Sequence, residues 1–312
     1  MNPNVLFKSQ TENPLLSFIL LDWSCRESFH ALKYLNNQSV HRDQYEIILV
    51  EYYNRVAPQI QEGLAECSAD NKPPLIDQWI VMGMPENVYY HKHLMYNVGI
   101  LVGRGKIICI CDSDAIYPPN FVETVLQVFS TNRDIVLHFD EICNDSRRFY
   151  PFNYPTIEEI IGEGCVNWVN GKSSGILAQE DRIHQRNYGA CMCALRKDII
   201  EIGGADEHID YLGHICGPYD LTFRLINAGK REIWHEDVYI YHVWHPGNTG
   251  RGNYLGPHDG RNMSLPALLA RESGRILPLD ENPAIKTARQ GTLAYAVQQE
   301  RLRKIWKRLG TI

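Results

Sequence analysis

The sequence KIICICDSDAIYPP, residues 106–119, contains the feature that decides the fold we predict. It begins with a short apolar run, which Asp112 and Asp114 follow directly, with two prolines close behind. A short, continuously apolar run is typical of a strand buried on both faces of a parallel sheet. Open α/β sheets bind their ligands beyond the carboxyl ends of the strands. The two aspartates are therefore expected at a ligand-binding edge.

Strands and helices alternate through the first half of the chain. Runs rich in apolar residues and typical of strands lie at residues 15–21, 45–55, 77–83 and 106–111. Segments with apolar residues at helical spacing lie between them. This alternation predicts right-handed βαβ units and an open, mostly parallel sheet flanked by helices. Glu51, in the second run, is then expected at the same edge of the sheet as Asp112.

Composition and charge exclude several classes of protein. The chain has 312 residues, 44% hydrophobic and 22% charged, which is ordinary for a soluble globular protein. A net charge of −6 is opposite to the basic excess of a nucleic-acid-binding protein, so no nucleic-acid partner is expected. No apolar run reaches the ~18 residues that a membrane helix needs, and the first residues lack the pattern of a signal peptide. These features predict a cytoplasmic location.

Four of the nine cysteines alternate along two predicted strands. Cys109 and Cys111 share one strand, and Cys191 and Cys193 share the other. Side chains two residues apart on a strand lie ~7 Å apart, a poor distance for a disulfide. The sequence also lacks a second ligand pair at the spacing of a zinc finger. We therefore expect buried thiols that act as small apolar side chains in a reducing compartment.

The two carboxylates of Asp112 and Asp114 repel each other unless a cation lies between them. A diphosphate about 4 Å from a bare carboxylate is repelled by ~4 kcal/mol at an effective dielectric constant of about 20. Mg²⁺ or Mn²⁺ binds carboxylate oxygens and keeps coordination sites for substrate phosphates. The pair therefore predicts a divalent metal and a phosphate-containing substrate. The alternative is a solvated turn in which Asp114 caps the following helix.

Six motifs lie in order between Pro14 and Gly247: SFILLDWSCRESFHALKYLNNQSV, YEIILVEYYNR, MYNVGILVGRGKIICICDSD, IGGADEHI, DLTFRLINAG and YHVWHPG. This ordered set resembles the motifs of the family-2 glycosyltransferases of the GT-A type. The resemblance implies an open mixed, mostly parallel sheet with a Rossmann-like nucleotide-binding half. The donor half would lie at about 14–118 and the acceptor half at about 119–246, within a catalytic domain at 1–255.

The resemblance also implies roles for residues of the donor half. Asp112 and Asp114 would hold the metal and the diphosphate of a nucleotide sugar. Asp22, Trp23 and Glu51 would line the base and the ribose, although Asp22 stands where the family more often has a small residue. The implied donor is a nucleotide-diphosphate sugar, a UDP-sugar by first choice, and the implied cofactor is Mn²⁺ or Mg²⁺.

Residues elsewhere in the chain would complete this site. In this family a histidine after the last strand often completes the metal shell, which makes His242 and His245 candidates. His245 is preferred because it ends the strand and precedes Pro-Gly; a structural histidine is the alternative. Arg251 and Arg261, in a Gly-rich loop, would close over the diphosphate or face solvent. Lys92 lies near the donor side by its place in the motifs, or is a surface charge.

The sequence departs from the family pattern at the catalytic base. Family members usually carry a Glu-Asp pair just before the Asp-Leu-x-x-Arg helix, where this chain has Gly-Pro. An inverting transferase needs a carboxylate that takes the proton of the acceptor hydroxyl. Asp220 is the first candidate and Asp210 the second, with Glu207 and His208 as further candidates. Asp220 would alternatively be a charge at a helix N-terminus.

The C-terminal segment at 256–312 is expected to form a loop and a basic amphipathic helix. The apolar stripe of this helix consists of Leu293, Val297, Leu302, Ile305, Trp306 and Leu309. Five basic residues flank it: Arg301, Arg303, Lys304, Lys307 and Arg308. The pattern suits a membrane surface that presents a lipid-linked acceptor. Docking on its own domain, or on a partner in a homodimer, is the alternative.

Together these features predict a metal-dependent glycosyltransferase of polysaccharide biosynthesis. It would move a sugar from a nucleotide-diphosphate sugar to a glycan or lipid-linked acceptor, with inversion. One alternative is a catalytically silent sugar-nucleotide-binding homologue or assembly partner, which the missing Glu-Asp pair favours. Another is a sugar-phosphate nucleotidyltransferase, which should carry a Gly-rich loop after the first strand, whereas LLDWSCRES has no glycine.

Overall fold

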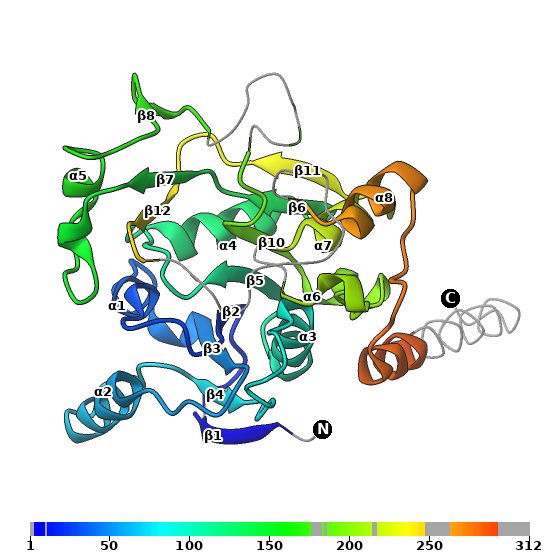
Figure 1. Cartoon of the computed structure of the whole chain (residues 1–312), viewed down its shortest axis with the longest axis horizontal. Coiled ribbons are helices and arrows are strands. Elements are labelled where there is room, and N and C mark those ends of the chain that lie inside the picture. The colour runs from blue at the N-terminus through cyan, green and yellow to red at the C-terminus, as the bar shows by residue number, and fades with distance from the viewer. Residues whose placement is uncertain are drawn as a thin grey trace, which may run out of the picture.

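A computed structural model gives the arrangement of the chain in space (Figure 1). The structure describes residues 3–9, 11–175, 183, 186–213, 217–246 and 263–292. Within these ranges, helices cover both faces of a central sheet. No helix of the described ranges is long and apolar enough to cross a bilayer.

The central sheet has eight strands in the order β1-β4-β3-β2-β5-β10-β6-β11. They are β1 (Asn4–Lys8), β2 (Leu16–Asp22), β3 (Tyr45–Glu51), β4 (Gln78–Val81), β5 (Ile107–Asp112), β6 (Ile135–His138), β10 (Cys191–Leu195) and β11 (Arg231–Trp234). The four strands β2 to β5 are mutually parallel, as the alternation predicts. β1 is antiparallel to β4, and β10 is antiparallel to both β5 and β6. The open mixed, mostly parallel sheet is therefore confirmed.

Two hydrophobic cores lie on opposite faces of this sheet. One face packs against α1 (His30–Leu35), α2 (Pro58–Ala69) and α4 (Phe121–Thr131). The other packs against α3 (Lys92–Val102), α6 (Arg196–Glu201) and α7 (Tyr219–Asn227). Successive residues of a strand alternate between the two cores, so Phe18 lies in the first and Ile19 in the second. Burial on both faces explains why these strands are continuously apolar.

Several elements were not anticipated from the sequence. They are the edge strand β1, the strand β7 (Glu141–Asn144) that pairs with the expected last strand β12 (Ile240–Val243), the hairpin β8 (Trp168–Val169) and β9 (Lys172–Ser173), α5 (Ile157–Ile160) and α8 (Leu265–Ser273). β1 is mostly exposed, so it has no continuous apolar run. β7 and β12 are parallel neighbours in a small second sheet beside α5 (Figure 1). This small sheet places His242, in β12, and His245, which follows it, at the end of β5.

The expectation that the paired cysteines stay apart is wrong. β5 and β10 are antiparallel neighbours, so Cys111 faces Cys191 and Cys109 faces Cys193. The sulfur of Cys111 lies 3.2 Å from that of Cys191 and 3.3 Å from that of Cys109. Burial in the apolar core raises the pKa of Cys109 and Cys111 well above the ordinary value. Cys109, Cys111, Cys191 and Cys193 are all buried, which fits the expected role as buried thiols.

The described part of the C-terminal segment packs against the domain. Residues 283–292 are helical, and Ile285 is fully buried against the core formed with α3, α6 and α7. α8 packs on α7. The remainder of the predicted basic helix, at 293–312, lies outside the described residues.

Candidate active site

Asp114, His242 and His245 form a group at the carboxyl end of β5. The Oδ2 atom of Asp114 lies 3.1 Å from Nε2 of His245 and 3.4 Å from Nε2 of His242. One ligand atom from each of the three residues lies within 4.8 Å of the others. Reciprocal backbone hydrogen bonds between Ile116 and Tyr241 hold β12 beside the loop that carries Asp114. Both histidines proposed from the sequence are therefore placed at the same carboxylate.

The carboxylate of Asp114 is almost completely buried, and its charge is compensated by the protein. Nη2 of Arg26, itself buried, lies 2.8 Å from Oδ2. Burial alone would raise the pKa of Asp114, but Arg26 and the two histidines hold it well below its usual value. The other oxygen, Oδ1, is buried and has no hydrogen-bond partner within the described residues. One carboxylate oxygen and two imidazole nitrogens are a donor set that fits a divalent transition metal such as Mn²⁺.

Asp112 is paired with a buried lysine. Nζ of Lys92 lies 3.2 Å from Oδ1 of Asp112, whose side chain is one-third exposed. The same ammonium lies 5.0 Å from the ring centre of Trp23, which is stacked on Tyr90 at 4.3 Å. Lys92 and Arg26 therefore supply positive charge beside Asp112 and Asp114. Lys92 is part of the site rather than a surface charge.

Asp22 and Glu51 are neighbours at the ends of the parallel strands β2 and β3. Both are at most 2% exposed. Glu51 accepts hydrogen bonds from the backbone amides of Ser24 and Tyr53 and from the Ser24 hydroxyl. Burial, and then the charge of Asp22, raises the pKa of Glu51 to about 8. These two acids thus fix the loop after β2, which carries Trp23.

Glu141, at the start of β7, is an acid of this site that sequence reasoning missed. Asn187 donates a hydrogen bond of 2.8 Å to its Oε2 atom. No hydrogen bond to Oε1 comes from the described residues. Burial, and then the charges of Asp112 and Asp114, raise the pKa of Glu141 above its ordinary value. The signal that could have revealed it is its place three residues after β6, at the carboxyl end of a strand.

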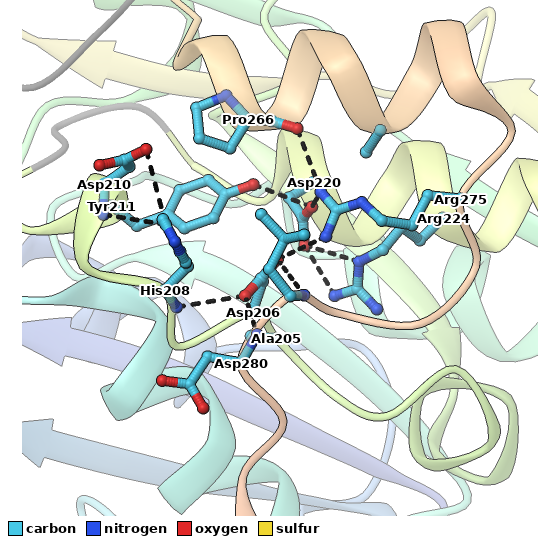
Figure 2. Close-up of polar contacts among 12 residues, drawn as sticks. Ala205, Asp206, His208, Asp210, Tyr211, Asp220, Arg224, Pro266, Arg275 and Asp280 are labelled. Atoms are coloured by element: carbon cyan, nitrogen blue, oxygen red, sulfur yellow. Dashed lines mark hydrogen bonds and ion pairs between the residues drawn. The ribbon is translucent and has the colours of Figure 1, made fainter.

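The structure argues against Asp220, the first candidate for the catalytic base. Asp220 is buried at the start of α7, among the side chains drawn in Figure 2. Its Oδ2 atom accepts a hydrogen bond of 2.8 Å from Nε of Arg224, and Nη2 of Arg224 lies 2.7 Å away. Its Oδ1 atom accepts one of 2.9 Å from Tyr211, and Arg275 lies 3.5 Å away. Both oxygens are thus engaged and shielded from an acceptor hydroxyl.

Two of the other candidates for the base, Asp210 and His208, lie in the same neighbourhood (Figure 2). Asp210 is partly exposed, and its Oδ2 atom lies 3.6 Å from Nδ1 of His208. Glu207 accepts hydrogen bonds from Asn97 and Asn282. Among the described residues, neither Asp210 nor Glu207 contacts Asp114, His242 or His245. Arg251 and Arg261, expected to close over the diphosphate, lie outside the described residues.

A protein-family model described as Glycosyl transferase family 2 matches residues 30–203, more than half of the chain. The chain belongs to this family. The matched region contains Glu51, Lys92, Asp112 and Asp114 and ends before the two histidines. The predicted recognition as a family-2 glycosyltransferase is therefore confirmed. No significant match to the sequence was found among curated proteins.

Solved structures of glycosyltransferases share the fold. Residues 1–349 of S. aureus TarS, in complex with UDP-GlcNAc, are 13% identical with a TM-score of 0.51, over 75% of this chain and 59% of that one. GalNAc-T7, with UDP, GalNAc and Mn²⁺, is 14% identical with a TM-score of 0.51, over 78% of this chain and 46% of that one. This chain therefore spans about half of the length of these proteins, and the likeness establishes the GT-A type fold.

Proposed function

We propose that this family-2 glycosyltransferase moves a sugar from a nucleotide-diphosphate sugar to a glycan or lipid-linked acceptor, with a divalent metal at Asp114, His242 and His245. The observation that carries the proposal is this group of three ligand-type side chains. It lies at the carboxyl end of β5, the edge where an open α/β sheet binds its ligands. A UDP-sugar is the first choice of donor, because UDP is present in the TarS and GalNAc-T7 complexes cited above.

The donor would bind over the ends of β2, β3 and β5. Mn²⁺ or Mg²⁺ held by Asp114 and the two histidines would supply positive charge to the departing diphosphate. The side chains of Arg26 and Lys92 add two fixed cations beside the same carboxylates. Trp23, held by its stack on Tyr90 and by the Asp22–Glu51 pair, would form a wall for the base. These residues orient the donor and lower the cost of bringing a diphosphate beside two aspartates.

Transfer with inversion needs a carboxylate that accepts the proton of the attacking hydroxyl. We assign this role to Glu141 in place of Asp220. Glu141 belongs to the charged cluster of Asp112, Asp114 and His242, and one of its oxygens is held by Asn187. In a single in-line displacement, the acceptor oxygen bonds to the sugar C1 as the bond from C1 to the diphosphate breaks. The hydroxyl proton passes to Glu141.

A second candidate is a protein that binds nucleotide sugars without turning them over. Both oxygens of Asp220 are engaged, one by Tyr211 and the other by Arg224. Because Asp220 is the acid nearest to the family's usual base position, this engagement favours a protein without turnover.

One assay separates these two functions. The purified protein is incubated with a panel of UDP- and GDP-sugars, with Mn²⁺ or with EDTA, and release of the nucleotide diphosphate is measured together with binding. Release that requires Mn²⁺ supports the transferase, because water can replace the acceptor. Mn²⁺-dependent binding without release, with or without saccharide acceptors, identifies the silent binder. If the protein shows no binding and no release, both functions are refuted.

A further inference from the structure

A wide groove lies at the end of the sheet opposite the metal-binding group. Its volume is about 970 Å³. Its floor contains the residue before β2, the start of β5 and the end of β10, represented by Leu15, Ile107 and Leu195. α4 and α6 form its walls, and the helix at 283–292 contributes Arg289 and Thr292.

This groove is remote from the donor site. β5 runs from Ile107 in the groove to Asp112 at the site. Five steps along a strand, at about 3.3 Å each, separate the two ends by ~17 Å. The groove is therefore not an extension of the nucleotide or acceptor pocket, and the proposed reaction leaves it without a role.

The groove combines an apolar floor with a basic rim. Ile107, Leu126, Phe129, Leu195 and Ile200 provide the apolar surface. The charged lining residues are Arg104, Lys106, Arg133, Arg196, Lys197, Arg289 and the single acid Glu201. Six cations face one anion here, although the whole chain carries a net charge of −6. The positive charge is therefore concentrated at this place.

Part of this positive charge is not compensated by neighbouring acids. Arg104 is paired with Glu46 and Arg289 with Glu281. Among the described residues, the other four basic residues have no acidic partner as close as these. Arg196 donates hydrogen bonds to carbonyl oxygens at the end of α3. Lys106 and Arg133 are exposed, and neither forms an ion pair with an acid among the described residues. Lys197 lies 3.9 Å from Asp198, which pairs more closely with Lys230.

The charge of the groove selects among its possible occupants. The chain's own residues 293–312 carry five basic residues and one acid, so the rim repels them. An anionic amphiphile matches both the apolar floor and the cationic rim. The anionic surface of a phospholipid bilayer has this chemistry, and basic residues at such a surface each contribute about 1 kcal/mol to binding.

We propose that this groove docks the protein on an anionic phospholipid membrane. The headgroups contact Lys106, Arg133, Arg196 and Lys197. In this orientation the metal-binding group, at the far end of β5, faces away from the bilayer. The donor then reaches the site from the aqueous side, and of the two proposed acceptors this orientation suits the glycan.

The test is co-sedimentation of the full chain with vesicles of phosphatidylcholine that contain a quarter phosphatidylglycerol, and with vesicles of phosphatidylcholine alone. The groove variant is Lys106→Glu/Arg133→Glu/Lys197→Glu. The matched control is Lys8→Glu/Lys72→Glu/Lys172→Glu, three exposed lysines away from the groove with the same change of net charge. Circular dichroism and the thermal midpoint establish that both variants fold.

We expect the unmodified chain to bind the anionic vesicles and to dissociate as salt increases. At about fivefold per basic residue, the groove variant should lose about 100-fold or more in affinity, and the control variant should lose far less. Equal binding to both kinds of vesicle would overturn the proposal. So would equal binding by both variants, which would assign the contact to the C-terminal residues. A dimer in sedimentation velocity that only the groove variant dissociates would identify a subunit contact instead.

Discussion

The guanidinium of Arg26 lies 2.8 Å from the carboxylate of Asp114, and both side chains are more than nine-tenths buried. The protein thus neutralises its central metal-ligand candidate with a cation of its own. Asp112 is neutralised in the same way by Lys92. Asp114 can therefore stay ionised in the folded chain before any ligand arrives, with its Oδ1 atom left for a cation.

Replacement of Arg26 tests this pairing. Arg26→Ala leaves Asp114 buried without its closest cation, so the free energy of unfolding should fall by about 3 kcal/mol. Added Mn²⁺ should stabilise this variant more than it stabilises the unmodified chain, because the metal then supplies the missing charge. Arg55→Ala is the control, since Arg55 is 30% exposed and 3.8 Å from its acid, Asp22. Urea unfolding with and without Mn²⁺ measures both effects. Equal losses in the two variants would show that the Arg26–Asp114 pair contributes little.

Replacement of Glu141 tests the proposed base. Glu141→Gln keeps the size and the hydrogen-bonding capacity of the side chain but removes the proton acceptor. Transfer should fall by about 10²- to 10⁴-fold, while the affinity for the nucleotide sugar and Mn²⁺ changes little. Glu163→Gln, at an exposed position, should leave both quantities unchanged. A Glu141→Gln variant with normal turnover would exclude this residue as the base.

Asp220 should be a structural residue. Asp220→Asn removes the charge that pairs with buried Arg224, so the free energy of unfolding should fall by about 3–5 kcal/mol. The folded fraction should bind the donor normally, because none of the contacts of Asp220 reaches the Asp114 group. Urea unfolding and donor titration on the same sample check the two statements. Unchanged stability combined with lost transfer would instead restore Asp220 as the catalytic base.

The stability of the chain should depend on the protonation of Glu51. Its pKa is raised to about 8 by burial and by Asp22, whereas an unfolded glutamate titrates near 4.5. Between pH 4.5 and 8 the folded state keeps a proton that the unfolded state releases, so rising pH favours unfolding. Glu51→Gln mimics the protonated acid and should escape this loss.

Thermal midpoints at pH 5, 7 and 9 measure this effect. The Glu51→Gln variant should match the unmodified chain at pH 5 and exceed it increasingly towards pH 9. The exposed Glu62→Gln serves as the control and should follow the unmodified chain. Parallel curves for all three proteins would show that Glu51 is ionised in the folded state at neutral pH.

The sequence reveals the strands that are buried on both faces and little of how distant strands meet. β2, β3 and β5 were predictable because their apolar runs are continuous. The half-exposed β7 and the edge strand β1 lack such runs. The antiparallel insertion of β10 beside β5 has no local signature, so the contact between Cys111 and Cys191 could not be foreseen.

The same limit applies to the site. Asp112 and Asp114 were identifiable because they directly follow a strand, but Arg26 and Glu141 reach them only through the tertiary fold. The role of Asp220 had a readable signal that was overlooked. Arg224 lies four residues further along the same helix, where an Asp–Arg pair forms an ion pair.

The most direct test of the metal-dependent donor site is calorimetric titration of a UDP-sugar into the protein. It is performed with Mn²⁺ and with EDTA, for the unmodified chain and for Asp114→Asn. We predict binding that requires Mn²⁺ in the unmodified chain and is at least tenfold weaker in Asp114→Asn. A GDP-sugar series establishes whether the base rather than the metal limits affinity. Binding of equal strength in EDTA, or an unchanged affinity in Asp114→Asn, would contradict a metal held by Asp114, His242 and His245.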